Sequence, residues 1–368
     1  MSSNKRTALY GAHKALGARL IPFAGWEMPV EYSGIAKEHV AVRTAGGLFD
    51  ISHMGEFEIQ GPEALDLVQT LCTNDAAKLV DGQAQYSAMA YPQGTAVDDV
   101  VIYRHNAEHF MLVVNASNAA KDFEWINSHN RVDATVEDVS DTLTLLSLQG
   151  PKANDILQPL TNVPLVTIPY YHFARAKVLN VDAIVSRTGY TGEDGFELYF
   201  TADKSEPVWT GLLDAGVPFG LVPAGLGARN TLRLEAKYLL YGNDMDGTTT
   251  LLEAGLGWIV NFEKTDFIGR EALQKQKREG IKRRLVGFEM LGKEIARDHY
   301  PVFIHGREVG HVTSGSPSIT LKTNIGLAYL PAENASIGTT FQVAVRNKTA
   351  EARVVRTPFY KRQGSTDG

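Results

Sequence analysis

The sequence predicts an α+β protein whose C-terminal part is an all-β domain. Up to about residue 284, strand and helix patterns alternate, and several predicted strands follow one another directly. Neighbouring strands of this kind favour antiparallel sheets. After that point the chain changes to short apolar strands that are separated by Gly, Asn and Pro turns, which is typical of an all-β domain.

The helices and strands of the first part follow from apolar spacing and from turn residues. The stretch 21–32 contains two prolines and a glycine among aromatic residues, and it predicts an ordered loop. The stretch 47–59 predicts a turn that leads into an alternating strand. Helices are expected at 8–17, 35–43, 61–73, 119–129, 150–157 and from about 226 to 236, and strands at 110–115, 132–139, 141–149, 174–179, 183–186 and 196–200.

Six short strands are expected in the C-terminal part. They cover 285–291, 302–304, 308–312, 324–329, 340–345 and 350–357. Residues 363–368 carry no such pattern and are expected to be disordered.

The composition, net charge and cysteine count argue against several classes of function. The 368 residues include 44% hydrophobic and 21% charged residues, which is ordinary for a water-soluble globular protein. The net charge of −6 argues against a general nucleic-acid binder. The single cysteine, Cys72, lies in an apolar run and excludes a thiol-rich metal site. No signal peptide or membrane span is expected, so the cytoplasm is the predicted location.

Two adjacent carboxylates stand out in the hairpin predicted for 86–103, whose turn is Pro92-Gln93-Gly94. Asp98 and Asp99 lie in an otherwise apolar strand, where aspartate is disfavoured. Because strand side chains alternate between faces, one of the two points into apolar surroundings whichever face is inside. The residues alone leave open which one, and both could also lie at a solvated strand end.

Three further features are candidates for a binding site. The loop 187–195 holds three glycines, so its backbone must turn tightly or approach a ligand closely. Glu197 follows it within an apolar strand. Arg229 lies on the apolar face of a helix and needs an anionic partner, which could be a ligand, Glu197 or Asp99.

Other charged groups have an ordinary structural interpretation beside a functional one. His53 is either a hydrogen-bonded core residue or a base or ligand. The basic segment 263–284 is either a solvated helix and linker or a docking patch for an acidic partner.

Long motifs in order along nearly the whole chain give a more specific signal. On these motifs the chain resembles the aminomethyltransferases, the T-proteins of the glycine cleavage system. The motifs are FAGWEMPVEY (23–32), LFDISHMGE (48–56), VDDVVIY (97–103), RTGYTGEDGFEL (187–198), GLGARNTLRLEA (225–236), LYGNDMD (240–246), EAGLGW (253–258), DFIGR (266–270) and VTSGSPS (312–318).

The resemblance implies a three-domain folate-binding aminomethyltransferase fold with two interleaved α+β subdomains and a C-terminal β-barrel. The folate-binding region would cover 1–275, with about 1–50 plus 145–275 interleaved with 51–144, and the barrel would cover 276–368. The implied reaction passes the one-carbon unit of the aminomethyl group on a lipoylated carrier, the H-protein, to tetrahydrofolate. The products are 5,10-methylenetetrahydrofolate, ammonia and the dihydrolipoyl carrier, and no metal is required.

The resemblance also implies roles for particular residues. Asp99 matches the family's key aspartate, which assists proton movement as N5 of the folate attacks, and Asp98 is then its structural neighbour. Residues expected to bind folate are Tyr86, Asn115, Tyr171, Tyr190, Glu197, Arg229 and Tyr241.

Departures from the family pattern are small. Lys237 and Tyr238 stand where members often have Gly and Met, and Leu251 stands where Pro is usual. Two other functions are known for this fold: a tetrahydrofolate-dependent demethylase and a folate-binding protein without catalysis. The chain has no flavin or dinucleotide fingerprint. The presence of the VDDVV motif and the match over the full length favour the transferase over the demethylase.

Overall fold

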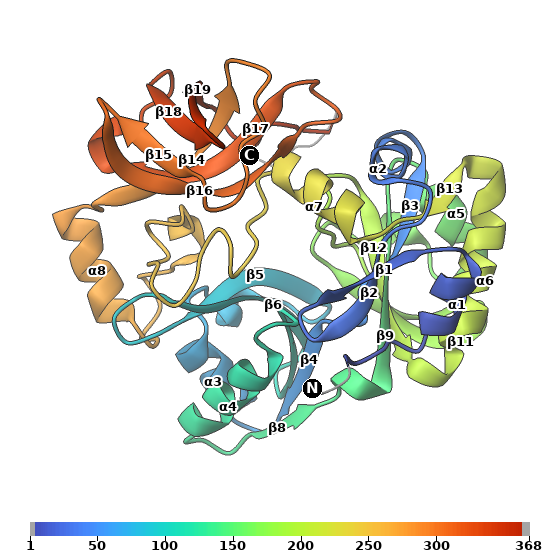
Figure 1. The fold of residues 1–368 in the computed structure, drawn as a ribbon. Coiled ribbons are helices and arrows are strands. Elements are labelled where there is room, and N and C mark those ends of the chain that lie inside the picture. The colour runs from blue at the N-terminus through green and yellow to red at the C-terminus, as the bar shows by residue number, and fades with distance from the viewer. Residues whose placement is uncertain (1–3, 363–368) are drawn as a thin grey trace. The chain divides into compact units, whose positions relative to one another are not determined.

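The computed structural model describes residues 4–362 and divides into two compact units (Figure 1). The first unit comprises the described residues up to Gln69 together with Ala76–Tyr86 and Val100–Asn230. The second comprises Thr70–Asp75, Ser87–Asp99 and the described residues from Thr231 onward. Residues 363–368, for which the sequence predicts disorder, lie outside the described part. The subdomain limits expected from the resemblance stay a prediction.

The N-terminal segment of the first unit corrects one expectation. The stretch predicted as a loop is a hairpin of β1 (Arg19–Phe23) and β2 (Trp26–Glu31), which follows α1 (Tyr10–Ala15). Its two-residue turn places Ala24 at φ 49° and Gly25 at φ 82°, the left-handed pair that matches the twist of a tight hairpin. Prolines are tolerated at the edge of a sheet, and in this ribbon Lys5 bridges to Trp26 but to neither Pro22 nor Pro29.

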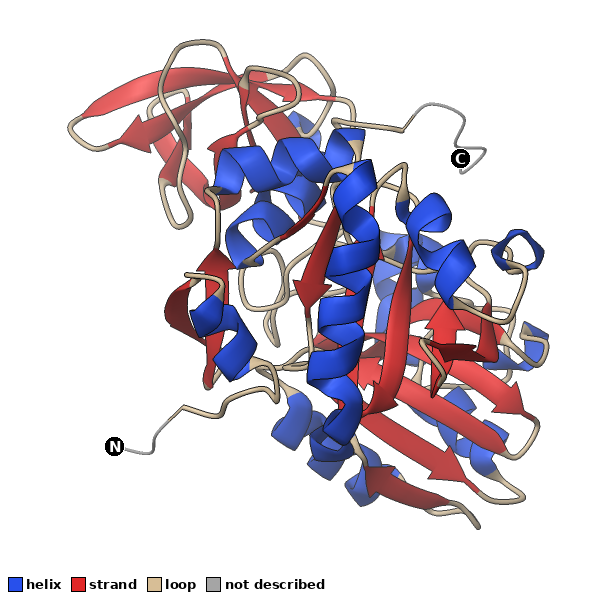
Figure 2. Ribbon diagram, turned by 90° about the vertical axis from the view of Figure 1, so that its right-hand side faces the viewer, coloured by secondary structure: helices blue, strands red, loops and turns tan. Residues whose placement is uncertain are grey.

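A six-stranded sheet forms one half of the first unit. The strand order is β10-β11-β12-β9-β3-β13, and all neighbours are antiparallel except β13 and β3. Figure 2 shows helices lying against its strands. Trp209 and Leu212 of α6 belong to the same buried cluster as Leu146 and Phe196 of the sheet. The elements are β3 (Gly46–Asp50), β9 (Leu143–Gln149), β10 (Phe173–Val178), β11 (Val181–Ser186), β12 (Gly195–Thr201), β13 (Leu221–Pro223), α2 (Ile35–Thr44), α5 (Ala153–Leu157), α6 (Ser205–Gly216) and α7 (Leu226–Glu235).

A five-stranded sheet has the order β5-β6-β7-β4-β8. Its first two strands confirm the predicted hairpin around Pro92-Gln93-Gly94. The elements are β4 (Gly55–Gln60), β5 (Gln83–Ala90), β6 (Ala96–Asn106), β7 (His109–Val114), β8 (Thr135–Asp138), α3 (Ala64–Leu71) and α4 (Ala119–His129).

The second unit contains the predicted C-terminal barrel. Six strands close in the order β14-β17-β16-β15-β18-β19, so the fold class expected from the resemblance is confirmed. Phe288, Val312 and Phe341 are among the residues that fill the barrel. The elements are α8 (Arg270–Glu279), β14 (Arg283–Met290), β15 (Pro301–Ile304), β16 (Arg307–Pro317), β17 (Asn324–Pro331), β18 (Thr340–Val345) and β19 (Lys348–Val355).

Two further differences from the sequence-based expectation concern the first unit. The stretch 47–59 holds parts of two strands, β3 and β4, joined by a short turn. The helix α6 and the strand β13 were not predicted at all. Short one-turn helices connect several of the elements in both units.

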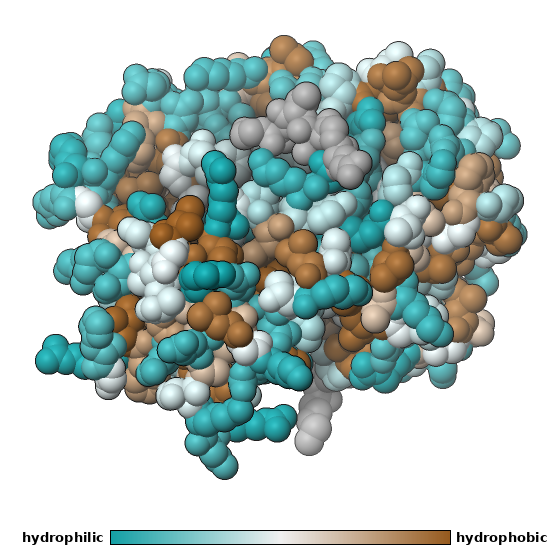
Figure 3. Space-filling model, turned by 90° about the horizontal axis from the view of Figure 1, so that it is seen from above, coloured by the Kyte–Doolittle hydropathy of each residue, from teal (hydrophilic) through white to brown (hydrophobic). Residues whose placement is uncertain are grey.

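Surface and burial are ordinary for a globular chain. No helix among residues 4–362 is long and apolar enough to cross a membrane. In the face shown in Figure 3, hydrophilic residues alternate with scattered hydrophobic patches. Cys72 is buried, and burial raises the pKa of its thiol to about 12.

Candidate functional site

A chain of hydroxyl groups within the first unit runs from the five-stranded sheet to the six-stranded sheet and ends on Glu197. The Thr188 hydroxyl donates to Glu197 Oε2 at 2.6 Å, and it lies 3.2 Å from the Tyr103 hydroxyl. Tyr103 in turn lies 2.8 Å from the Tyr199 hydroxyl. Tyr103 comes from β6 and Glu197 from β12, two strands that are far apart in the sequence and belong to different sheets. The network therefore holds the Glu197 carboxylate between these two sheets.

The glycine-rich loop owes its path to Gln149. The Gln149 amide donates to Thr188 O at 3.0 Å and accepts from the Thr191 hydroxyl at 3.0 Å. A Cβ on Gly189 would lie 2.1 Å from Gln149 Oε1, so a larger residue would displace this side chain. The close approach predicted from the glycines is therefore made to the protein's own glutamine, and it positions Thr188 and Tyr190.

Arg229 supplies a positive charge beside the network. Its guanidinium carbon lies 4.5 Å from the centre of the Tyr190 ring, a distance that allows a cation–π interaction. Arg229 also acts on Glu197, because its charge lowers the pKa of that carboxyl group. The structure thus brings together Tyr190, Glu197 and Arg229, three of the residues expected to bind folate.

Desolvation dominates the electrostatics of Glu197. It raises the pKa of the carboxyl group, and the hydrogen bond from Thr188 and the charge of Arg229 lower it in part. The pKa remains above the ordinary value. A carboxylate in such a place gains from any ligand that donates hydrogen bonds to it, since those bonds favour its charged form.

Two further side chains, Glu56 and His53, interact electrostatically with Glu197 and Arg229, respectively. The sequence did not establish that either of them belongs to the site. Glu56 is 1% exposed, its Oε1 has no hydrogen-bond partner, and burial raises its pKa well above the ordinary value. His53 is 3% exposed with a partnerless Nδ1, and desolvation followed by the charge of Arg229 lowers its pKa to about 4. His53 is therefore neutral at pH 7, and burial favours the neutral form of Glu56.

Glu56→Gln is expected to stabilise the protein increasingly as pH rises. The folded state keeps a proton on Glu56 that the unfolded chain releases above pH about 4.3, so wild-type stability falls with rising pH between the unfolded and folded pKa values. The loss amounts to about 1.4 kcal/mol per pH unit within that window. Thermal unfolding between pH 4.5 and 8 measures it. Glu137→Gln, an exposed position on β8, is the control, and parallel curves for the Glu56 variant and wild type would contradict the assignment.

The two aspartates of β6 differ in exposure. Asp98 is fully buried and Asp99 is half-buried. By strand alternation Asp99 shares its face of β6 with Val101 and Tyr103. Both aspartates belong to the second unit, as does Tyr241, whose hydroxyl donates to Ala96 O at 3.2 Å at the start of the same strand.

The remaining predicted residues lie in the first unit. Tyr86 is on β5 and Asn115 directly follows β7; both are half-buried. Tyr171 has a left-handed backbone (φ 59°), and its amide donates to Arg187 O at 3.0 Å, at the start of the glycine-rich loop. The roles of these three residues stay predictions.

The site of the first unit can hold a flat, hydrogen-bond-donating ring. Glu197 offers acceptor oxygens, while Tyr190 and Arg229 offer planar groups suited to stacking. A heteroaromatic ligand with amino and ring N–H groups matches both features.

Comparisons with known proteins give one answer over the whole length. The family model described as GCVT N-terminal domain matches residues 9–264, and the glycine cleavage T-protein C-terminal barrel domain matches residues 283–361. An aminomethyltransferase of Desulfitobacterium hafniense is 50% identical over 99% of this chain and 100% of its own. An aminomethyltransferase of Bacillus subtilis is 48% identical over 97% of this chain and 99% of its own. The crystal structure of the glycine cleavage system aminomethyltransferase T from Bartonella henselae superimposes with a TM-score of 0.92 at 33% identity, covering 98% of this chain and 99% of that one.

Proposed function

Because the chain belongs to the family of glycine cleavage T-proteins and is an aminomethyltransferase, we propose that it acts on a lipoylated carrier and on tetrahydrofolate. The carrier is the H-protein of the glycine cleavage system. The carbon of its aminomethyl group is transferred to the folate, which gives 5,10-methylenetetrahydrofolate, ammonia and the dihydrolipoyl carrier. We place the reaction in the cytoplasm and assign no metal to it.

The observation that carries the folate assignment is the half-buried, Thr188-bonded carboxylate of Glu197 beside Tyr190 and Arg229. The pterin of tetrahydrofolate is flat and presents amino and ring N–H groups. Glu197 accepts hydrogen bonds from these groups, and Tyr190 and Arg229 contact the ring. Tyr86, Asn115 and Tyr171 of the same unit are proposed to add contacts to the folate, and Tyr241 is proposed separately as a folate-binding residue.

The reaction forms two C–N bonds, to N5 and N10 of the folate, and breaks the C–S and C–N bonds of the aminomethyl group. Thiol and ammonia leave with the two protons that N5 and N10 lose, so no oxidant is needed. Much of the rate then comes from holding both reactants in place, since effective molarities for well-oriented reactants are large. We assign Asp99 the task of orienting the N5 region and assisting its proton.

Glu197→Gln is expected to weaken tetrahydrofolate binding by about 10- to 100-fold, because hydrogen bonds to a charged acceptor contribute about 1.5–3 kcal/mol. In the wild type, affinity falls as pH decreases through the raised pKa of Glu197, since the protonated group accepts fewer hydrogen bonds. The glutamine variant lacks this pH dependence. Binding titrations from pH 5 to 8 measure both effects, and an unchanged pH profile in the variant would remove Glu197 from the site.

The carrier is proposed to use the basic surface of the second unit. A cavity of about 670 Å³ is lined by Lys237, Lys277, Arg284 and Arg356, and no Asp or Glu is among its lining residues. Apolar residues also line it, among them Trp258 and Ile337, which are 71% and 70% exposed. This combination suits an acidic protein that carries an apolar lipoyl arm.

Combined charge reversal at Lys277 and Arg284 is expected to raise the KM for the carrier at least severalfold while KM for folate stays unchanged, because the attraction to an acidic partner becomes repulsion. The effect should shrink at high salt. Arg307→Glu, an exposed change on the barrel, is the control. If KM rises for folate instead, these residues contact its glutamate tail.

The direct test of the proposed function is a turnover assay with aminomethyl-loaded carrier and tetrahydrofolate. Equal amounts of ammonia and 5,10-methylenetetrahydrofolate are expected. Methyl transfer from a small O- or S-methyl donor without ammonia would show a demethylase instead. Folate binding without any turnover would show a binding protein.

A further inference from the structure

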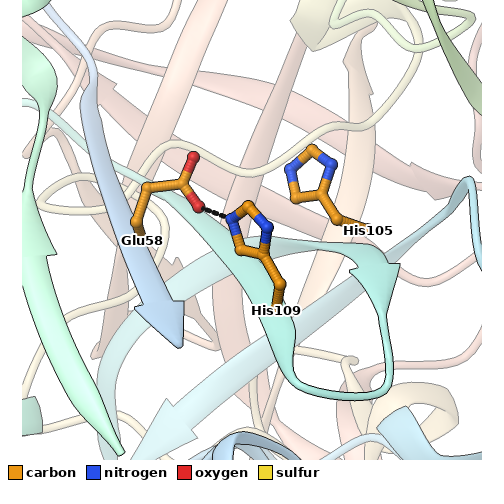
Figure 4. Close-up of side chains that lie close together, drawn as sticks. All are labelled: Glu58, His105 and His109. Carbon is orange, nitrogen blue, oxygen red and sulfur yellow. Dashed lines mark hydrogen bonds and ion pairs between the residues drawn. The ribbon is translucent and has the colours of Figure 1, made fainter. Parts of the chain in front are cut away.

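Glu58, His105 and His109 converge at one end of the five-stranded sheet (Figure 4). One ligand atom from each of the three side chains lies within 4.8 Å of the others. His109 Nε2 is hydrogen-bonded to Glu58 Oε2, and the rings of His105 and His109 are 4.4 Å apart. All three side chains are half-buried, and none takes part in the proposed transfer reaction.

Strand pairing explains why they meet. Asn106 pairs with His109 and Arg104 pairs with Phe110, and the register shifts between Arg104 and Asn106, which leaves His105 as the extra residue of a bulge. Bulges redirect side chains, and they occur often beside functional sites. Glu58 pairs with Met111 on β4 and β7, two residues along β7 from His109, and therefore lies on the same face as His109.

His105 has the properties of an unused ligand. Its Nε2 is buried and has no hydrogen-bond partner. An imidazole nitrogen of this kind can bind a metal ion once it carries no proton. The apolar side of the cluster is closed by Phe173, whose ring centre is 5.0 Å from that of His105.

We propose that Glu58, His105 and His109 form a binding site for one divalent transition-metal ion, with Zn²⁺ as the representative ion. Two imidazoles and one carboxylate are a ligand set that such ions use, and water fills the remaining position. Ligand atoms of a tetrahedral zinc ion lie roughly 3.3 Å apart. The three ligand atoms, which lie within 4.8 Å of one another, would have to move to that spacing. The ion would take the place of the proton between Glu58 and His109, and that proton would move to His109 Nδ1 or be released to solvent.

The neighbouring Arg175 is expected to weaken the binding of a cation at this site. Arg175 Nη2 lies 3.4 Å from His105 Nδ1, whereas the partnerless nitrogen of that ring is Nε2. The Arg175 side chain is exposed. Its positive charge opposes a cation and favours the tautomer with a proton on Nε2. Removing Arg175 is therefore expected to strengthen metal binding, a gain that loss of structure cannot produce.

The test is a calorimetric titration of the chelator-treated, full-length protein with Zn²⁺. One equivalent is expected to bind. His105→Ala, His109→Ala and Glu58→Gln are each expected to weaken binding about 100-fold or more, since even loss of an outer-shell partner costs about 10- to 100-fold. Arg175→Ala should tighten binding severalfold. Substitution with Co²⁺ should give visible absorption bands that the three ligand variants lose.

The matched control is His299→Ala on the barrel. His299 and His311 form another stacked pair, with ring centres 6.3 Å apart, and they belong to no three-ligand group among residues 4–362. The proposal would be overturned if His299→Ala, and not the three ligand variants, weakened Zn²⁺ binding. It would also be overturned if neither the wild type nor Arg175→Ala bound Zn²⁺ saturably, and the cluster would then be a Glu58–His109 hydrogen bond only. Neither folate nor carrier enters the titration, so its outcome is independent of the proposed function.

Discussion

Asp99→Asn is expected to lower kcat for the transfer by about 10²- to 10⁴-fold, the usual range for a positioned group that moves a proton. Asparagine keeps the size and can still orient a ligand, but it cannot take up a proton at neutral pH. The Kd of tetrahydrofolate should therefore change much less than kcat. Steady-state turnover together with a folate titration separates the two quantities.

Asp98→Asn is the matched control for this prediction. Asp98 is fully buried, whereas Asp99 is half-buried and so open to a ligand. The Asp98 variant is expected to lose stability while its folded fraction keeps most of its kcat. Equal losses of kcat in both variants would show that the pair acts together or that the catalytic role belongs to the other aspartate.

Asp244→Ala is expected to lower the free energy of unfolding by about 3–5 kcal/mol, because removing one partner of a buried ion pair is strongly destabilising. Arg233 Nη1 lies 2.5 Å from Asp244 Oδ2, and the two side chains are 2% and 0% exposed. Asp244 Oδ1 also accepts hydrogen bonds from Thr313 and Ser314, at 2.6 and 2.7 Å. The carboxylate thus joins the end of α7 to the barrel strand β16 within the second unit. Urea unfolding measures the loss.

Two comparisons make the prediction specific. Replacing Arg233 and Asp244 together by leucine should destabilise less than Asp244→Ala alone, since both charges of the buried pair are then replaced by apolar side chains. Breaking the exposed Lys348–Glu294 pair, whose side chains are 66% and 24% exposed, should change stability little although its atoms are 2.6 Å apart. Equal effects of breaking the buried pair and the exposed pair would contradict the account.

Local sequence patterns predicted many of the helices and strands. They failed where residues typical of loops lie in a strand pair. The helix at 119–129 and the six barrel strands follow directly from periodicity and turn residues. The hairpin of β1 and β2 was missed because its two prolines and its glycine are typical of a loop. Pairing within an isolated ribbon tolerates them, and that pairing is visible only in three dimensions.

The site was only partly predictable for a similar reason. Glu197 and Arg229 stand out as charges in apolar surroundings. Glu56 does not, because its alternating strand is equally compatible with a solvated face, and only the structure shows that this side chain is buried. Gln149 is a further case, since the sequence showed a tight loop but not what it packs on.

One departure from the family pattern has a structural consequence. Lys237 adopts a left-handed backbone with φ 59°, at the position where family members often have glycine. A glycine there avoids a conformational cost of about 1–2 kcal/mol. In this chain the lysine also lines the basic cavity, so the strain coincides with an added positive charge.

The most direct test of the central claim is a single turnover with carrier whose aminomethyl carbon is labelled with ¹³C. In the presence of saturating tetrahydrofolate, the label is expected in 5,10-methylenetetrahydrofolate, with one ammonia released for each labelled carbon. The Asp99→Asn variant should bind the same folate and transfer the label far more slowly. Label that stays on the carrier while folate is fully bound would contradict the claim that this chain is a folate-dependent aminomethyltransferase of the glycine cleavage system.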